Sequence, residues 1–126
     1  MNVFEDSGLS KDLVERIKKQ RITIPTLIQE KCIPLMMKGK DIIGQSATGS
    51  GKTLAFGCGI IEKVKAGKGL QALILTPTRE LAEQVKSEIV KLTNTLNILA
   101  VYGGVAIGPQ IDRLEDSEVV IATPGR

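Results

Sequence analysis

The chain has 126 residues, a length that fits one domain and lies at the lower end for an α/β nucleotide-binding fold. Apolar residues make up 42% of it, which excludes a disordered chain, and no apolar run reaches the ~18 residues of a membrane span. The net charge of +3 is compatible with a polyanionic partner. However, two phenylalanines and one tyrosine are too few aromatic residues for a base-stacking surface.

Histidine is absent, which excludes histidine-based catalysis and histidine metal ligation. The two cysteines, Cys32 and Cys58, are far apart in the chain and form no CxxC pair. This spacing predicts buried thiols rather than a disulfide or a metal site. No signal peptide is visible at residues 1–6, so a cytoplasmic protein is the default expectation.

The first third of the chain predicts two helices and a strand. Ser10 is a suitable N-cap for an amphipathic helix that ends near Gln20. A second helix is expected from Thr26 to Gly39, with Pro34 bending or interrupting it. The apolar residues at 41–45 then predict a strand.

Helices and strands alternate in the rest of the chain. The expected helices span 51–65, 79–93 and 108–115, and the expected strands span 70–75, 98–102 and 119–122. The strand at 70–75 is almost wholly apolar, as is typical of a parallel strand covered on both faces. One stripe of the helix at 79–93 carries Leu81, Val85, Ile89 and Leu92. The alternation predicts an α/β fold with a doubly wound, mostly parallel sheet flanked by helices.

A glycine-rich segment lies between the first expected strand and the next helix. Residues 46–53 read SATGSGKT, in which backbone N–H groups and the helix start can hold phosphate oxygens. Lys52 can reach the β- and γ-phosphates, and the Thr53 hydroxyl can bind Mg²⁺. The strict pattern has glycine where this chain has Ser46, which is tolerable if φ is negative there. A flexible turn with an incidental lysine is the alternative, but the segment predicts a nucleoside triphosphate site.

Ligands bind at the carboxyl ends of the strands in sheets of this kind. Four loops follow the expected strands and should therefore face one edge of the sheet. They are the segments 46–53, 77–82, 103–104 and 123–126.

Several of these segments resemble the motifs of the DEAD-box RNA helicases in their first RecA-like domain. ATGSGKT at 47–53 resembles motif I, PTRELA at 77–82 resembles motif Ia, and TPGR at 123–126 resembles motif Ib. The pair Gly103-Gly104 is similar to the GG element, and residues 22–29 are similar to the Q motif. The resemblance covers essentially the whole chain, with the Q-motif region at 1–39 and motifs I to Ib at 40–126.

The resemblance implies an ATP site with bound Mg²⁺. Gln29 would read adenine through its N6 and N7 edge, and Phe4 matches an upstream aromatic residue that would stack on the base. Thr26 and Gln29 also fit a capping box, and Phe4 also fits a packing role at the first helix. Lys52 and Thr53 would serve the reaction, with Thr53 on the metal. The other implied nucleotide contacts are Ser46, Ala47, Thr48, Gly49, Ser50 and Gly51.

The resemblance also implies contacts with the sugar-phosphate backbone of RNA. Arg79 lies at a helix start, where the dipole disfavours a cation, so a phosphate contact and an ion pair with Glu80 or Glu83 are the alternatives. The pair Gly103-Gly104 is either a turn or a point of close approach to RNA. The implied RNA contacts are Pro77, Thr78, Arg79, Gly103, Gly104, Thr123, Gly125 and Arg126.

Two departures from the family pattern are Arg21, where the Q motif usually has glycine, and Ser46. The sequence also stops at Arg126, before the family's Walker-B strand and before its second RecA-like domain. We therefore expect the N-terminal part of the first RecA-like domain, from a longer ATP-dependent RNA helicase. This part alone should bind ATP weakly and hydrolyse essentially none. The alternatives are a P-loop DNA translocase domain and a non-catalytic nucleotide- or protein-binding module.

Overall fold

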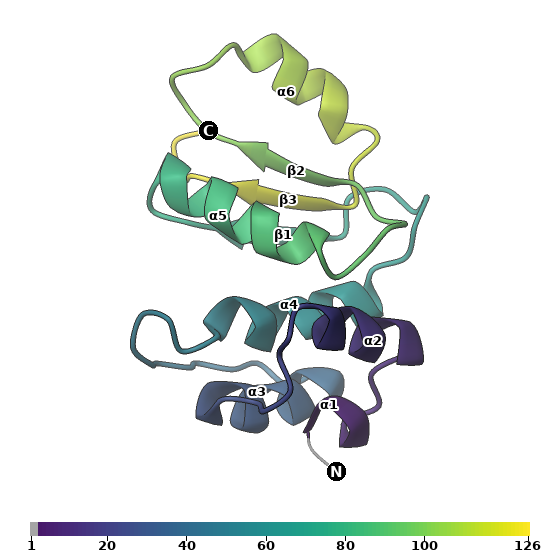
Figure 1. Ribbon diagram of the computed structural model, residues 1–126. Helices are drawn as coiled ribbons and strands as arrows, with labels where there is room; N and C mark the ends of the chain where they lie inside the picture. The colour runs from purple at the N-terminus through teal and green to yellow at the C-terminus, as the bar shows by residue number, and fades with distance from the viewer. Residues whose placement is uncertain (1–2) are drawn as a thin grey trace. The chain divides into compact units, whose positions relative to one another are not determined.

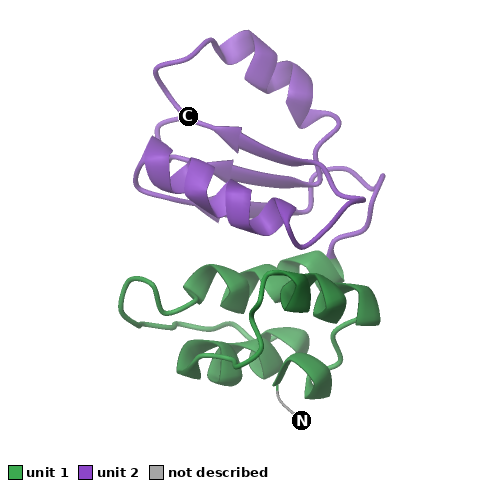
Figure 2. Ribbon diagram, in the orientation of Figure 1, with its two compact units in different colours: residues 1–63 green, residues 64–126 purple. Residues whose placement is uncertain are grey.

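A computed structural model describes residues 3–126 and shows two compact units (Figure 2). The first unit ends at Lys63, and the second runs from Val64 to Arg126. The phosphate-loop segment at 46–53 therefore belongs to the first unit, and all the strands belong to the second.

The first unit is helical (Figure 1). Helix α3 packs against both α1 and α4. The core of this unit is formed by side chains that are almost fully buried, among them Leu13, Ile17, Ile33 and Cys58. Within residues 3–63 the helices are α1 (Val3–Asp6), α2 (Lys11–Lys19), α3 (Leu27–Met37) and α4 (Lys52–Lys63).

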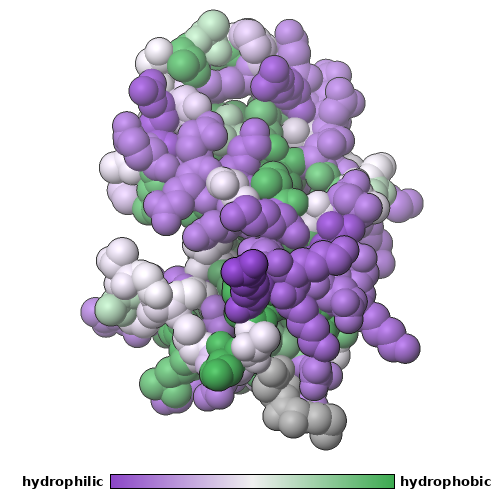
Figure 3. All heavy atoms as spheres, in the orientation of Figure 1, coloured by the Kyte–Doolittle hydropathy of each residue, from purple (hydrophilic) through white to green (hydrophobic). Residues whose placement is uncertain are grey.

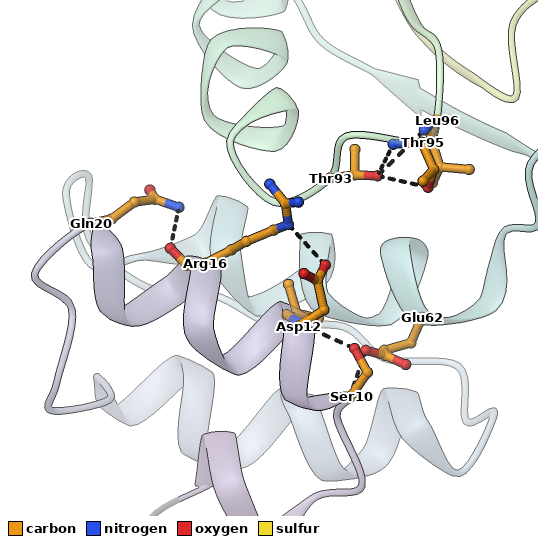
Figure 4. Close-up of polar contacts among 9 residues, drawn as sticks. Ser10, Asp12, Arg16, Gln20, Glu62, Thr93, Thr95 and Leu96 are labelled. Atoms are coloured by element: carbon orange, nitrogen blue, oxygen red, sulfur yellow. Dashed lines mark hydrogen bonds and ion pairs between the residues drawn. The ribbon is translucent and has the colours of Figure 1, made fainter.

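The start of α2 is fixed by Ser10, as the sequence predicts. The Ser10 hydroxyl accepts a hydrogen bond from the Leu13 N–H at 3.2 Å, which is the N-cap bond. The Ser10 N–H donates to the Glu62 carboxylate at 2.8 Å and so links the start of α2 to α4 (Figure 4). One turn further on, Arg16 and Asp12 form an ion pair of 2.8 Å on the exposed side of α2 (Figure 4).

Helix α3 runs through Pro34 and ends at Met37, within the predicted range of 26–39. A Cβ at Gly59 in α4 would lie 2.7 Å from Met36 Cε and 3.1 Å from Met36 Cβ. The glycine therefore permits close packing of α4 on α3, which explains its presence within a helix. Both cysteines are buried free thiols, as predicted. Burial, with a smaller contribution from Glu62, raises the pKa of the Cys58 thiol to about 12.

The predicted strand at 41–45 is not formed. Residues 41–47 have no regular secondary structure, and the Ile43 side chain is completely exposed. A strand is stabilised by hydrogen bonds to a neighbouring strand, and residues 3–126 provide none that pairs with this segment. The apolar sequence alone is insufficient to define a strand here.

The second unit contains a parallel sheet of three strands in the order β1-β3-β2 (Figure 1). The strands are β1 (Ala72–Leu75), β2 (Ile98–Val101) and β3 (Val119–Ala122). Val119 is in register with Ala72 on one side and with Ile98 on the other. All four residues of the central strand β3 are buried. The α/β class and the parallel sheet are thus confirmed.

The two helices of this unit are α5 (Arg79–Val90) and α6 (Ile107–Leu114). Leu114 of α6 packs against a cluster formed by Leu99, Val101, Val120 and Ala122, while α5 contacts β2 and β3. Because side chains alternate along a strand, Val119 and Ile121 point to the other face and are also fully buried.

Two expectations about burial in this unit are wrong. Leu73 and Leu75 of β1 are about 60% exposed, although this strand was expected to be covered on both faces. The reason is that α6 packs over β2, at the opposite edge of the sheet from β1. In α5 the buried stripe begins with Ala82 rather than Leu81, which lies on the exposed side.

Glu118 links the amino ends of the strands through hydrogen bonds. Its side chain is only 4% exposed and accepts hydrogen bonds from Gly67 N–H at 3.4 Å and Asn97 N–H at 3.3 Å. Its backbone carbonyl accepts from the N–H groups of Gln71 and Ala72. The chain segments that lead into β1 and β2 are therefore both bound to the residue before β3.

Hydrophilic residues cover much of the face shown in Figure 3, with hydrophobic residues reaching the surface in both units. No helix among residues 3–126 has the length and hydropathy required to cross a bilayer.

Candidate functional site

The phosphate-loop segment, residues 46–53, forms a turn that leads directly into α4. Gly49 and Gly51 have φ values of 81° and 84°, a region that favours glycine. Arg21 is the single non-glycine residue of positive φ in the described part of the chain, so Ser46 avoids that region. The condition under which serine is tolerated at this position is therefore met.

Lys52, the first residue of α4, reaches back across this loop. Its Nζ atom donates a hydrogen bond to the Ser46 carbonyl at 2.8 Å, although the side chain is otherwise exposed. The Ser46 and Ser50 hydroxyls are also hydrogen-bonded, at 2.5 Å. The ammonium group thus lies at the mouth of the loop, where it can contact an anion held there.

The start of α4 supplies further anion-binding groups. The Ala55 N–H donates to the Gly51 carbonyl at 3.1 Å, so the N–H groups before it have no acceptor within the helix. Thr53 lies half-buried in this first turn. No group of three or more His, Cys, Asp or Glu side chains within residues 3–126 could hold a metal ion. A cation here would need Thr53 together with oxygens of the bound phosphate.

Gln29 links α3 to the phosphate-loop segment. It is 3% exposed, its Oε1 accepts from the Thr26 N–H at 2.9 Å, and its Nε2 donates to the Gly51 carbonyl at 3.2 Å. The capping bond that the sequence suggested therefore exists. One hydrogen of Nε2 and one lone pair of Oε1 are not used in these two bonds, but a ligand could reach them only if the buried side chain became accessible.

Gly51 is in close contact with this glutamine. A Cβ at Gly51 would collide with Gln29 Nε2 and would lie 3.2 Å from Thr26 Oγ1. The absence of a side chain at Gly51 is therefore required both by its φ value and by its neighbours.

Phe4 is buried in α1, with 3% of its surface exposed. This burial favours the packing role that the sequence offered as an alternative. Stacking on adenine would require its ring to become accessible, so this role stays a prediction.

A cavity of about 610 Å³ lies in the first unit among α3, the segment 40–44 and α4. Lys52 is the one residue that it shares with the phosphate-loop segment. Its other lining residues are mostly apolar, so the cavity is chemically unsuited to a triphosphate.

In the second unit, the loops after the three strands meet at the carboxyl edge of the sheet. Thr78 caps α5 by accepting from the Leu81 N–H at 3.1 Å. The Arg79 guanidinium lies over the Tyr102 ring, 5.7 Å from its centre, and beside Gly104. The loops at 77–79 and 103–104 therefore lie close to each other, as their place in the topology predicts.

The third loop is attached to the same edge. The Arg126 N–H donates to the Thr123 carbonyl at 3.1 Å, and Arg126 Nη1 donates to the Val105 carbonyl at 3.3 Å. Gly103 and Gly125 have no atom within 4 Å of a Cβ that they could carry. No contact among the described residues therefore requires glycine at these two positions.

The family model of the DEAD/DEAH box helicases matches residues 26–126. The chain belongs to this helicase family. It is 45% identical, over its whole length, to the ATP-dependent RNA helicase CshA of Listeria monocytogenes, of which it covers 25%. A crystal structure of a DEAD box protein from Methanococcus jannaschii shares 44% identity with a TM-score of 0.94, over 98% of this chain and 35% of that one. A hypothetical ATP-dependent RNA helicase from Sulfolobus tokodaii gives 37% identity and a TM-score of 0.83, over 93% of this chain and 34% of that one.

The chain thus spans about a quarter to a third of the length of these DEAD/DEAH box relatives.

Within the family pattern, the departure at Arg21 has a structural consequence. Arg21 follows α2 and has a φ value of 63°, in the left-handed region where glycine is favoured. The glycine that is usual in the family's Q motif would adopt this conformation without strain.

We therefore expect Arg21→Gly to stabilise the chain by about 1 kcal/mol, since strain at a non-glycine residue is removed. The measurement is the urea midpoint, compared with that of Lys19→Gly in the last turn of α2, which should fall because glycine disfavours a helix interior. A midpoint for Arg21→Gly below that of the wild type would contradict the assignment of strain.

The sequence-predicted residues thus form two groups, one in each unit. In the first unit, Gln29 is hydrogen-bonded to Gly51, and Ser46 is hydrogen-bonded to Ser50 and Lys52. In the second unit, Arg79 Nη1 lies 3.5 Å from the position that a Cβ would take at Gly104, and Arg126 donates to the Val105 carbonyl. Sequence reasoning missed Tyr102 as a member of the second group, although it is the sole tyrosine and directly precedes Gly103-Gly104.

Proposed function

We propose that this chain is the ATP- and RNA-binding N-terminal part of an ATP-dependent RNA helicase. The observation that carries the proposal is the conformation of the phosphate-loop segment. Lys52 Nζ is hydrogen-bonded to the Ser46 carbonyl, and Gln29 is hydrogen-bonded to Gly51. The names of the relatives, which include ATP-dependent RNA helicases, support the same activity. The whole chain would be the N-terminal part of the first RecA-like domain, with the Q-motif region at 1–39 and motifs I to Ib at 40–126.

For the nucleotide, we assign the loop Ser46–Gly51 to the phosphates, Lys52 to the β- and γ-phosphates, and Thr53 to Mg²⁺. Mg²⁺, when bound, would neutralise charge on the phosphates. Gln29 would read adenine and Phe4 would stack on it. The positive φ values of Gly49 and Gly51 and the N–H groups at the start of α4 that have no acceptor within the helix support this assignment to the phosphates.

For RNA, we assign the carboxyl edge of the sheet to the sugar-phosphate backbone. The contacts would be made by Pro77, Thr78, Arg79, Gly103, Gly104, Thr123, Gly125 and Arg126. Such contacts ignore base identity, so sequence specificity should be slight. A second RecA-like domain would complete the intact enzyme, and the proposal includes a cytoplasmic location, which two free thiols favour.

Binding of ATP and GTP to the 126-residue chain tests the nucleotide site. We expect Lys52→Ala to weaken the binding of both nucleotides by at least about tenfold, because a charged phosphate contact is lost. Gln29→Ala should weaken the binding of ATP more than that of GTP, because the lost amide reads the adenine edge. Turnover should be essentially absent, since none of the described strands is followed by a carboxylate.

Lys40→Ala is the matched control, because Lys40 lines the apolar cavity and lies outside the phosphate loop. Equal affinities of the wild type and Lys52→Ala for ATP would overturn the phosphate site. Equal losses of ATP and GTP binding in Gln29→Ala would overturn the assignment of adenine reading to Gln29.

A further inference from the structure

Tyr102 contacts two charged residues of α5 at once. Its ring lies under the Arg79 guanidinium, whose carbon is 5.7 Å from the ring centre. Its hydroxyl donates a hydrogen bond to Glu83 Oε1 at 2.7 Å. The Arg79 Nη1 atom lies 3.5 Å from the position that a Cβ would take at Gly104. Tyr102 therefore separates a cation from an anion at the carboxyl edge of the sheet.

Arg79 and Glu83 have the spacing at which opposite charges pair on a helix. Asp12 and Arg16 of α2 have this same spacing, and they form an ion pair of 2.8 Å. Within residues 3–126, however, Arg79 has no carboxylate within 4.0 Å. One difference is the order of the charges, since the acid comes first in α2 and the base comes first in α5. Another is that the Glu83 carboxylate is hydrogen-bonded to the Tyr102 hydroxyl.

An unpaired arginine at this position is electrostatically unfavourable. Arg79 is the first residue of α5, where the positive end of the helix dipole disfavours a cation. An anion that binds at the helix start would reverse this disadvantage, and Arg79 is exposed to receive it. Glu83 would compete with such an anion if it were free to pair with Arg79.

We propose that Tyr102 is a positioning residue for RNA binding. Its ring orients Arg79 beside Gly104, and its hydroxyl binds the Glu83 carboxylate and so prevents an ion pair between Glu83 and Arg79. The inference rests on the proposed function, because it takes an RNA phosphate as the anion that Arg79 receives.

The hydroxyl is available for this role at neutral pH. Its hydrogen bond to Glu83 raises the pKa of Tyr102 above the usual value of 10, with burial and the Glu83 charge acting in the same direction and Arg79 opposing them. The protonated form, which donates the bond, is therefore favoured.

Tyr102→Phe separates the two roles of the side chain, because it keeps the ring and removes the hydroxyl. Affinity for a fluorescent oligouridylate would be measured by anisotropy at several salt concentrations. We expect Tyr102→Phe to weaken binding about fivefold and to lower the salt slope by about 0.7, the effect of one lost phosphate contact. In a Glu83→Gln background the same change should have no effect, because no carboxylate remains to pair with Arg79.

Glu80→Gln is the matched control, since it removes a charge from the same turn of α5 without touching Tyr102. In that background Tyr102→Phe should still weaken binding about fivefold. Circular dichroism of every variant would verify that it folds. An effect of Tyr102→Phe that is absent, or equal in the Glu83→Gln and Glu80→Gln backgrounds, would overturn the inference.

Arg79→Ala distinguishes this failure from that of the proposed function. If Arg79→Ala weakens RNA binding and Tyr102→Phe does not, the inference alone is overturned. If the wild-type chain binds no RNA, or Arg79→Ala changes nothing, the assignment of Arg79 to RNA is overturned and the inference falls with it.

Discussion

Gly51→Ala is expected to lower the free energy of unfolding by about 3 kcal/mol. A residue with a Cβ at a φ of 84° is strained by about 1–2 kcal/mol. The Cβ would also collide with Gln29 Nε2, and displacing that amide breaks its hydrogen bond to the Gly51 carbonyl, at a cost of about 1–2 kcal/mol. Urea unfolding of the 126-residue chain, followed by circular dichroism, measures the sum.

Gly49→Ala provides a matched control for this change. Gly49 has nearly the same φ, 81°, but no atom lies within 4 Å of the position its Cβ would take. Its substitution should therefore cost only the strain, about 1–2 kcal/mol. In a Gln29→Ala background the two glycine substitutions should cost the same. If they already do so in the wild type, the contact between Gly51 and Gln29 contributes nothing to stability.

Local sequence signals predicted the helices well because helix ends are determined by nearby residues. Ser10 caps α2 through the Leu13 N–H, and Thr78 caps α5 through the Leu81 N–H. The condition set for Ser46 was also a local property of its backbone. These predictions needed no knowledge of the tertiary structure.

The predictions that failed depended on neighbours that lie far away in the sequence. The segment 41–45 has the apolar pattern of a strand but no pairing partner in the described chain. The sequence predicted that Leu73 and Leu75 are buried, but they are exposed because α6 packs over the opposite edge of their sheet. The hydroxyl of Tyr102 finds Glu83 at a distance of 19 residues, so its part in the arginine site could not be read from either segment alone.

Glu118→Ala is expected to destabilise the chain by about 2–3 kcal/mol. Its carboxylate accepts from the Gly67 and Asn97 N–H groups, at a residue that is 4% exposed. Alanine would leave both donors without their acceptor. Urea unfolding is again the measurement.

Two further variants isolate the carboxylate as the cause. Glu118→Gln keeps one acceptor oxygen, so it should recover about half of the loss. Glu115→Ala removes an exposed glutamate at the end of α6 and should change stability by no more than about 0.5 kcal/mol. Equal stability of Glu118→Ala and Glu115→Ala would show that the hydrogen bonds of Glu118 do not hold the amino ends of the strands. A large loss for Glu118→Ala alone would show that this side chain stabilises the parallel sheet through the amino ends of its strands.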